Sequence, residues 1–153
     1  MKASVLALSL TMTLAMTACS TMTKSPEEMT RTRQSVLGSW TLEKASALPE
    51  VPANILVTLH PDNNSKNNNE LGVSGFSGVN HFVGSATIDW EKQKLVLSPL
   101  ASTRMMGPEP RMQFEQAFLK QMEQVEKFRL EDGGKLILLT RAGEKIVFQS
   151  GTQ

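Results

Sequence analysis

The sequence has few of the residues that build reactive sites. It contains one cysteine, two histidines and no tyrosine. The single cysteine, Cys19, excludes an intramolecular disulfide and leaves no thiol pair for a metal site. His60 and His81 are too few to complete a metal site alone, and we expect both at the surface, one at a strand end and one in a turn. We therefore expect neither a bound metal nor a cofactor.

A catalytic constellation is also missing. No Ser-His-Asp arrangement can be recognised, and neither Asp89 with Glu91 nor Glu109 with Glu115 has a spacing that would by itself pair two carboxylates for acid–base chemistry. The sequence therefore predicts a protein that is not an enzyme. A hydrolase stays open as a third hypothesis, and it would need ionisable groups clustered in a cleft.

Neither an excess of charge nor a membrane-spanning run is present. Lysine and arginine total 16 against 15 acidic residues. A chain so balanced has no electrostatic footprint for nucleic acid, so we expect no nucleic-acid partner. The uncharged run Ala3 to Met16 would span about 21 Å as a helix, short of the roughly 30 Å hydrocarbon core. This disfavours a stable transmembrane helix.

The N-terminus has the three parts of a secretory signal: Lys2, the uncharged run, and small residues before a cut. Met16-Thr17-Ala18-Cys19 resembles a lipobox, which implies cleavage after residue 18 and lipid on the sulfur of Cys19. The expected partner is then a membrane, held through this anchor. Ser20 behind the cysteine fits sorting to the outer membrane, with the folded part facing the periplasm.

The remaining chain divides into a short polar segment and one domain. Residues 19–35 are polar, and we interpret them as a tether holding the domain away from the membrane. Pro26-Glu27-Glu28 is also a suitable start for a short helix, since proline and acidic side chains favour the first turn. Residues 36–150 are long enough for one hydrophobic core.

Hydrophobic periodicity predicts an α+β domain with about seven or eight strands and one helix. Phe114, Phe118, Met122 and Val125 recur at helical spacing and predict an amphipathic helix over 109–124 that packs against the sheet. The Asn-rich segment 61–70 is typical of an exposed hairpin loop. The strands are expected near residues 38–45, 54–60, 71–76, 82–89, 94–98, 127–131, 135–139 and 145–148.

Three stretches in this order resemble one protein family: Leu37-Gly-Ser-Trp-Thr-Leu42, Gly75-Phe-Ser-Gly-Val-Asn-His-Phe-Val-Gly84 and Leu100-Ala-Ser-Thr-Arg-Met-Met-Gly107. Together they are similar to the META domain, or HslJ-like, family. The resemblance covers roughly residues 37–149 and implies a compact, curved antiparallel sheet around one helix. Members are often outer-membrane lipoproteins linked to stress or drug tolerance. No enzymatic activity is established for the family as a whole.

The middle stretch supplies four family-motif residues, Gly75, Asn80, Phe82 and Gly84. Asn80 has two interpretations: it polarises a ligand, or it stabilises the glycine-rich turn through backbone hydrogen bonds. We favour the structural role.

The third stretch supplies Thr103, Arg104 and Met105. Thr103 and Arg104 would either bind an anionic group or hold backbone carbonyls, and we favour the second. For Met105 and Met106 we expect core positions, although methionine also suits an adaptable binding groove.

One departure from the family pattern involves sulfur. Relatives commonly have cysteine where this chain has Val79 and Gly107, and we infer that these two positions are neighbours in the fold. A bridge closing this loop would contribute roughly 3–4 kcal/mol in the chain-entropy model.

These observations favour a non-enzymatic envelope lipoprotein that acts in stress or drug tolerance, or as an accessory factor for envelope or secretion proteins. The alternative is a carrier that binds a lipid or hydrophobic small molecule between helix and sheet. A cavity of several hundred Å³ would favour the carrier, whereas a filled core with an exposed apolar patch would favour a protein partner.

Overall fold

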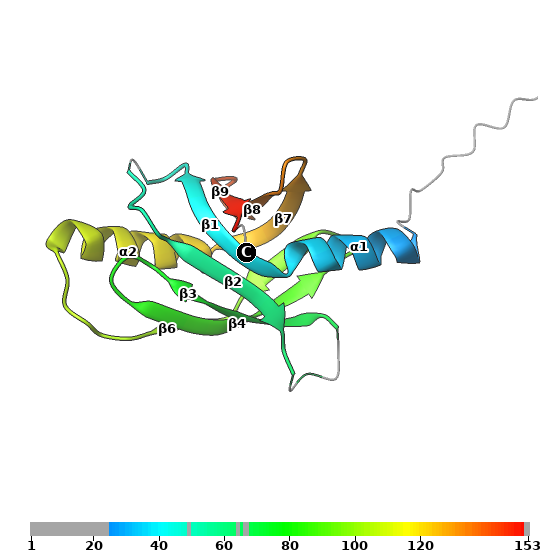
Figure 1. The fold of residues 1–153 in the computed structure, drawn as a ribbon, viewed down its shortest axis with the longest axis horizontal. Coiled ribbons are helices and arrows are strands. Elements are labelled where there is room, and N and C mark those ends of the chain that lie inside the picture. Colours follow the sequence, from blue (N-terminus) through cyan, green and yellow to red (C-terminus); the bar gives the residue numbers. More distant parts are fainter. Residues whose placement is uncertain (1–24, 49, 64, 66–67, 152–153) are drawn as a thin grey trace, which may run out of the picture.

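The structure is a computed structural model, and it describes residues 25–48, 50–63, 65 and 68–151. The signal peptide predicted over 1–18 and the lipidation site predicted at Cys19 lie outside this range. Figure 1 shows the described chain as a curved sheet with one helix at each end.

The order of elements follows the expected pattern of strands, one long helix and three closing strands, with an additional helix in front. We did not predict β6, because a strand of two residues is too short to show an alternating pattern. The elements are α1 (Pro26–Val36), β1 (Gly38–Ala45), β2 (Leu56–Pro61), β3 (Glu70–Phe76), β4 (His81–Asp89), β5 (Lys94–Leu97), β6 (Ala101–Ser102), α2 (Glu109–Met122), β7 (Val125–Glu131), β8 (Lys135–Thr140) and β9 (Lys145–Ser150).

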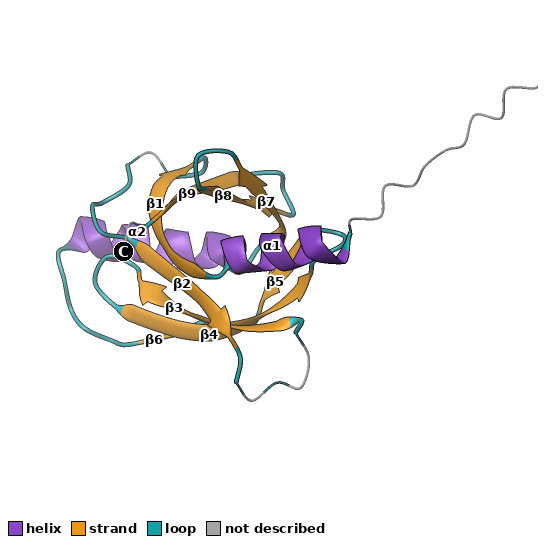
Figure 2. Cartoon of the chain, turned by 45° about the vertical axis from the view of Figure 1, so that its right-hand side comes forward, coloured by secondary structure: helices purple, strands orange, loops and turns teal. Residues whose placement is uncertain are grey.

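The sheet closes on itself. Its strand order is β3-β2-β1-β9-β8-β7-β5-β4-β6, and the further pairing of β3 with β4 joins the ends. Eight strands thus form a closed antiparallel barrel with β6 as an extra strand on β4, and Figure 2 shows the ring they outline. We expected a curved sheet, and the observed sheet is more closed than that. Local patterns predict strands, but the pairings that close a barrel join strands far apart in sequence.

The closure is uneven around the ring. The β3–β4 hairpin pairs continuously from Glu70↔Thr87 to Phe76↔His81. Between β5 and β7, in contrast, the only residues in register are Lys94↔Lys127. A backbone hydrogen bond from Phe128 to Gln93 supports this narrow seam.

Helix α2 fills the barrel from one end. Phe118 is fully buried and Met122 is 1% exposed. Phe118 meets Phe82 of β4 edge to face at 6.5 Å and stacks on Phe114 at 5.8 Å. The helical face predicted from the sequence is therefore the face that enters the core.

Helix α1 occupies residues that we assigned to a polar tether, beginning at the Pro26-Glu27-Glu28 start. Ser25 caps it by accepting the backbone N–H of Glu28. At its other end Val36 is fully buried, and its carbonyl accepts the indole N–H of Trp40. Among the described residues, neither helix has the length and apolar composition needed to cross a membrane.

Candidate functional site

The family-motif residues meet around a tight turn between β3 and β4. The turn is closed by a hydrogen bond from the Ser77 backbone N–H to the Asn80 carbonyl, at 2.9 Å. This places Asn80 beside the first half of α2, where Glu115 lies. Ser77, Asn80 and Glu115 are buried polar residues, being 0, 5 and 8% exposed.

The Glu115 carboxylate accepts four hydrogen bonds from this turn. Its Oε2 accepts the Ser77 hydroxyl and the Asn80 backbone N–H, both at 2.7 Å, and the Val79 backbone N–H at 3.2 Å. Its Oε1 accepts the Asn80 side-chain amide at 2.7 Å. One side chain of α2 thereby ties the helix to the β3–β4 turn.

These donors keep Glu115 ionised. Burial alone would raise its pKa, since a buried carboxylate loses hydration. The hydrogen bonds from Ser77, Asn80 and Val79 stabilise the charged form and outweigh burial, so the pKa of Glu115 lies below its usual range. A carboxylate with a lowered pKa is a weak general base, and four donors already compete for its lone pairs.

Asn80 also binds the segment that follows β6 in the sequence. Its Oδ1 accepts the Thr103 hydroxyl at 2.8 Å and the Met105 backbone N–H at 2.7 Å. The Thr103 backbone N–H also donates to the His81 carbonyl, at 3.0 Å. The side-chain oxygen of Asn80 thus binds this segment, and its side-chain nitrogen chiefly binds Glu115.

The segment Thr103–Pro108, which we call the methionine loop, is fixed at its base but exposed along its length. Met105 is 51% and Met106 87% exposed. Our expectation that these two methionines belong to the core was wrong: Asn80 anchors the Met105 backbone at the barrel, and both side chains are exposed. Arg104 is also exposed, and none of the described residues accepts a hydrogen bond from its side chain.

Sequence comparison agrees with this assembly of motifs. The sequence model of the META domain matches residues 32–153. The chain belongs to the META domain family. No curated protein matches it.

Solved structures share this META fold. A protein from Burkholderia xenovorans, determined by NMR, has 25% sequence identity and a TM-score of 0.59, and the match covers 80% of this chain and 88% of that one. A second protein solved by NMR has 19% identity and a TM-score of 0.51, over 73% of this chain and 87% of its own. The second match supports the fold alone.

The remaining META motif residues allow close packing inside the barrel. A side chain at Gly75 would collide with the Leu56 carbonyl oxygen and the ring of Phe82, its partner in register. A side chain at Gly84 would meet Leu100 Cδ2 at 2.6 Å. We infer that both glycines are needed because the Phe82 ring and Leu100 occupy the space a Cβ would take.

Val79 and Gly107, the two positions that we inferred to be neighbours, lie in contact. A Cβ placed on Gly107 would be 3.3 Å from Val79 Cβ and 2.7 Å from Val79 Cγ2. Disulfide Cβ atoms are usually about 3.5–4.5 Å apart, so a small shift brings the pair into range. In this chain the valine methyls occupy the place of the bridge and tie the methionine loop to the turn.

Phe114, Phe118 and Met122 of α2 are buried in the core of this META domain. Two hollows lie beside this helix: one of about 430 Å³ is lined by Leu48, Pro110 and Phe114, and one of about 470 Å³ by Ser102, Met112 and Glu115. Neither Met105 nor Met106 lines either hollow. Within the described ranges, no three His, Cys, Asp or Glu side chains gather closely enough to hold a metal ion.

Glu115 is the residue whose role we did not predict. We examined it only as half of a carboxylate pair with Glu109. The sequence did contain a signal: Glu115 is three residues before Phe118 and seven before Met122, so it lies on the apolar face of the helix. A carboxylate at such a position must find buried donors, because burying an unpaired charge is costly.

Proposed function

We propose that this META domain protein is a non-enzymatic envelope lipoprotein that binds another envelope protein through its methionine loop. One observation carries the proposal: Met105 and Met106 are exposed on a loop that a buried hydrogen-bond network holds in place. Exposing two methionines costs apolar burial, and fixing the loop costs conformational entropy. Both costs are offset if the loop is a preformed contact surface.

The chemistry of the loop suits a protein partner. Methionine adapts its shape to an apolar groove, and arginine is enriched in protein interfaces. Arg104 next to the methionines supplies a cation that is free to pair with a partner's carboxylate. Preorganisation by Asn80 lowers the entropy lost on binding.

The burial of α2 side chains in the barrel core favours this proposal over a carrier. A ligand between helix and sheet would have to displace Phe118 and Met122, which are fully packed. Glu115 likewise favours a binding role over hydrolysis, since four hydrogen bonds use its carboxylate to hold the turn. The expected lipid anchor at Cys19 would keep the loop and its partner at the same membrane, and the stress or drug tolerance linked to relatives would then arise from the partner.

The test is chemical crosslinking and capture from native membranes, followed by mass spectrometry of proteins and lipids. The full chain is compared with a variant carrying Met105→Ser and Met106→Ser, and with Val96→Ser as a matched exposed control. We expect a defined envelope protein with the wild type and the control, and its loss with the double variant. Equal recovery from all three, or recovery of lipid alone, would refute the proposal.

A further inference from the structure

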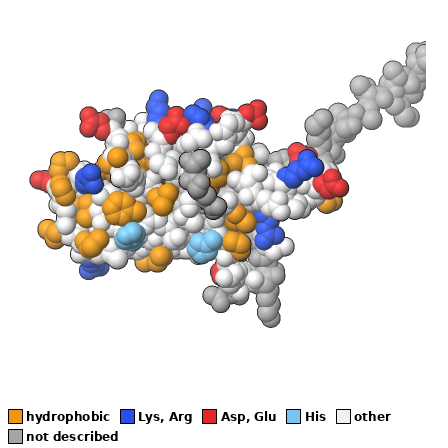
Figure 3. All heavy atoms as spheres, in the orientation of Figure 1, with side chains coloured by type: hydrophobic (Ala, Val, Ile, Leu, Met, Phe, Trp, Pro, Cys, Tyr) orange, Lys and Arg blue, Asp and Glu red, His pale blue; other side chains and the backbone are white. Residues whose placement is uncertain are grey.

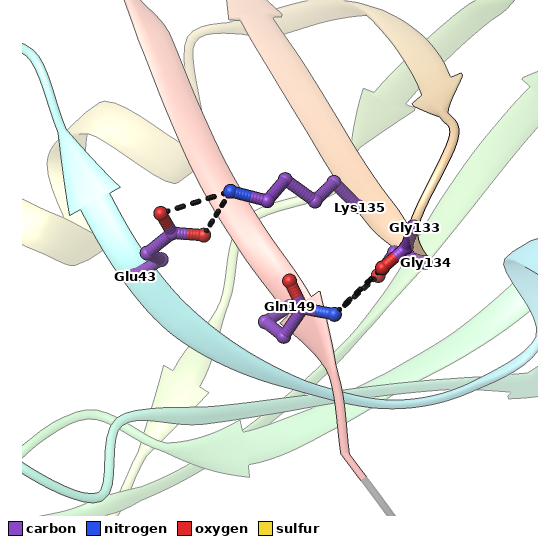
Figure 4. A network of polar contacts seen from close by, with 5 residues as sticks. All are labelled: Glu43, Gly133, Gly134, Lys135 and Gln149. Atoms are coloured by element: carbon purple, nitrogen blue, oxygen red, sulfur yellow. Dashed lines mark hydrogen bonds and ion pairs between the residues drawn. The ribbon is translucent and has the colours of Figure 1, made fainter.

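The outer surface of the barrel is divided between a charged and an uncharged flank. On the charged flank, Lys135 of β8 pairs with Glu43 of β1 at 2.8 Å, and Gln149 of β9 binds the Gly133 and Gly134 carbonyls, as Figure 4 shows. Arg129 and Glu131 of β7 add a weaker pair. Charged side chains of both signs therefore cover this side.

The opposite flank has none over most of its length, and exposed Glu70, in register with Thr87, marks its end. The outward-facing residues of 56–60, 72–76 and 81–87, on β2, β3 and β4, include no Lys, Arg, Asp or Glu. We call this surface the uncharged flank. Figure 3 shows its two histidines among apolar and neutral side chains, with charged side chains toward the rim. In a chain that is 20% charged, this is a marked local depletion.

Register places its side chains in two parallel rows. Leu56, Phe76 and His81 form one row, and Thr58, Ser74 and Val83 form the next. Phe76 and His81 are in ring contact at 5.2 Å. Val83 is 58% exposed. The result is a partly apolar face on the wall of the barrel, and sheet faces of this kind pack against another sheet at about 10 Å.

We propose that the uncharged flank is where a second copy of this chain binds. A partner that brought charges onto this flank would bury them without a counter-charge, which is unfavourable. Its surface must therefore be uncharged as well. The same flank on a second copy meets this condition, and a two-fold contact sets the flank against itself without like-charge repulsion.

The area of the uncharged flank indicates how strongly two copies should bind. Strands lie about 4.8 Å apart and outward positions repeat about every 6.8 Å, so the flank on β2, β3 and β4 covers on the order of 300 Å². Stable interfaces bury about 800 Å² from each partner. The dimer is therefore a weak one, half-formed at micromolar concentrations or above.

Sedimentation velocity of the full chain in a mild detergent, over about 1–200 µM, tests this. Three chains are compared: wild type, Val83→Lys at the most exposed apolar residue of the flank, and Ala142→Lys in the exposed turn before β9. The last two carry the same added charge. Circular dichroism confirms that each is folded. Phosphatidylcholine vesicles are added in a parallel experiment.

We expect wild type and Ala142→Lys to shift from monomer to dimer with concentration, and Val83→Lys to stay monomeric across the range. A wild type that remains monomeric, or a Val83→Lys chain that associates equally well, would overturn the inference. So would vesicle binding by a monomeric wild type that Val83→Lys abolishes, because the flank would then face lipid. None of these outcomes depends on the methionine loop.

Discussion

Replacing Glu115 by alanine tests whether the buried network holds the domain together. The change removes one acceptor side chain and leaves four donors of Ser77, Val79 and Asn80 without it. A buried donor left unsatisfied costs about 1–3 kcal/mol, and such costs do not add fully. Glu115 is 8% exposed, so water replaces part of what is lost. We expect a loss of about 3–5 kcal/mol in the free energy of unfolding.

Against a typical domain stability of about 5–15 kcal/mol, this is a large fraction. It corresponds to a fall in Tm of roughly 10–20 °C. Urea unfolding followed by circular dichroism measures the free energy, and calorimetry measures Tm. Glu109→Ala is the matched control, since it removes the same carboxylate from the same helix at an exposed position. Its expected cost is below about 1 kcal/mol.

The pH dependence supplies a second readout of the same residue. The pKa of Glu115 is lowered in the folded state, so its carboxylate stabilises the fold above its usual value of 4.5. This stabilisation is lost as the pH falls through the lowered folded value. Unfolding should therefore be easier at about pH 3.5 than at neutral pH, and Glu115→Gln should reduce the difference. Equal stabilities of Glu115→Ala and Glu109→Ala at neutral pH would refute the structural role.

Three further predictions follow from the same region and from the N-terminus. Asn80→Ala removes the anchor of the methionine loop, and we expect trypsin to cut after Arg104 several-fold faster while the global Tm falls less than for a core deletion; an unchanged rate would contradict the anchoring role. Val79→Cys with Gly107→Cys should form a bridge without reductant, detected by gel shift and thiol titration, and recovery of free thiols or intermolecular dimers would count against their contact. Cys19→Ala should abolish fatty-acid labelling, and undiminished labelling would sink the lipidation proposal.

The elements of the fold were predictable because each has a local signature. Phe114, Phe118 and Met122 at helical spacing predicted α2, and alternation predicted the strands. The closed ring was not predictable in this way. The β1–β9 pairing joins strands about a hundred residues apart, and the sequence of neither strand indicates which strand it pairs with. The resemblance to the META family implied the curvature but understated the closure.

The candidate site was likewise predictable only in part. Asn80 stood out because it lies in a glycine-rich turn, but its partner Glu115 is 35 residues away, and only the folded helix brings the two together. Met105 and Met106 were misplaced in the core because hydrophobicity alone predicts burial. The backbone of Met105 is held by a hydrogen bond to Asn80, and a pattern of side chains does not predict such a contact.

The central claim is that the fixed, exposed methionine loop contacts another envelope protein. Photo-crosslinking in living cells from position 106 tests it most directly, with position 142 as an exposed reference. The account predicts a discrete adduct with one or a few envelope proteins from position 106, none from 142, and a weaker adduct when Asn80→Ala loosens the loop. Lipid adducts alone, or the same adducts from both positions, would contradict it.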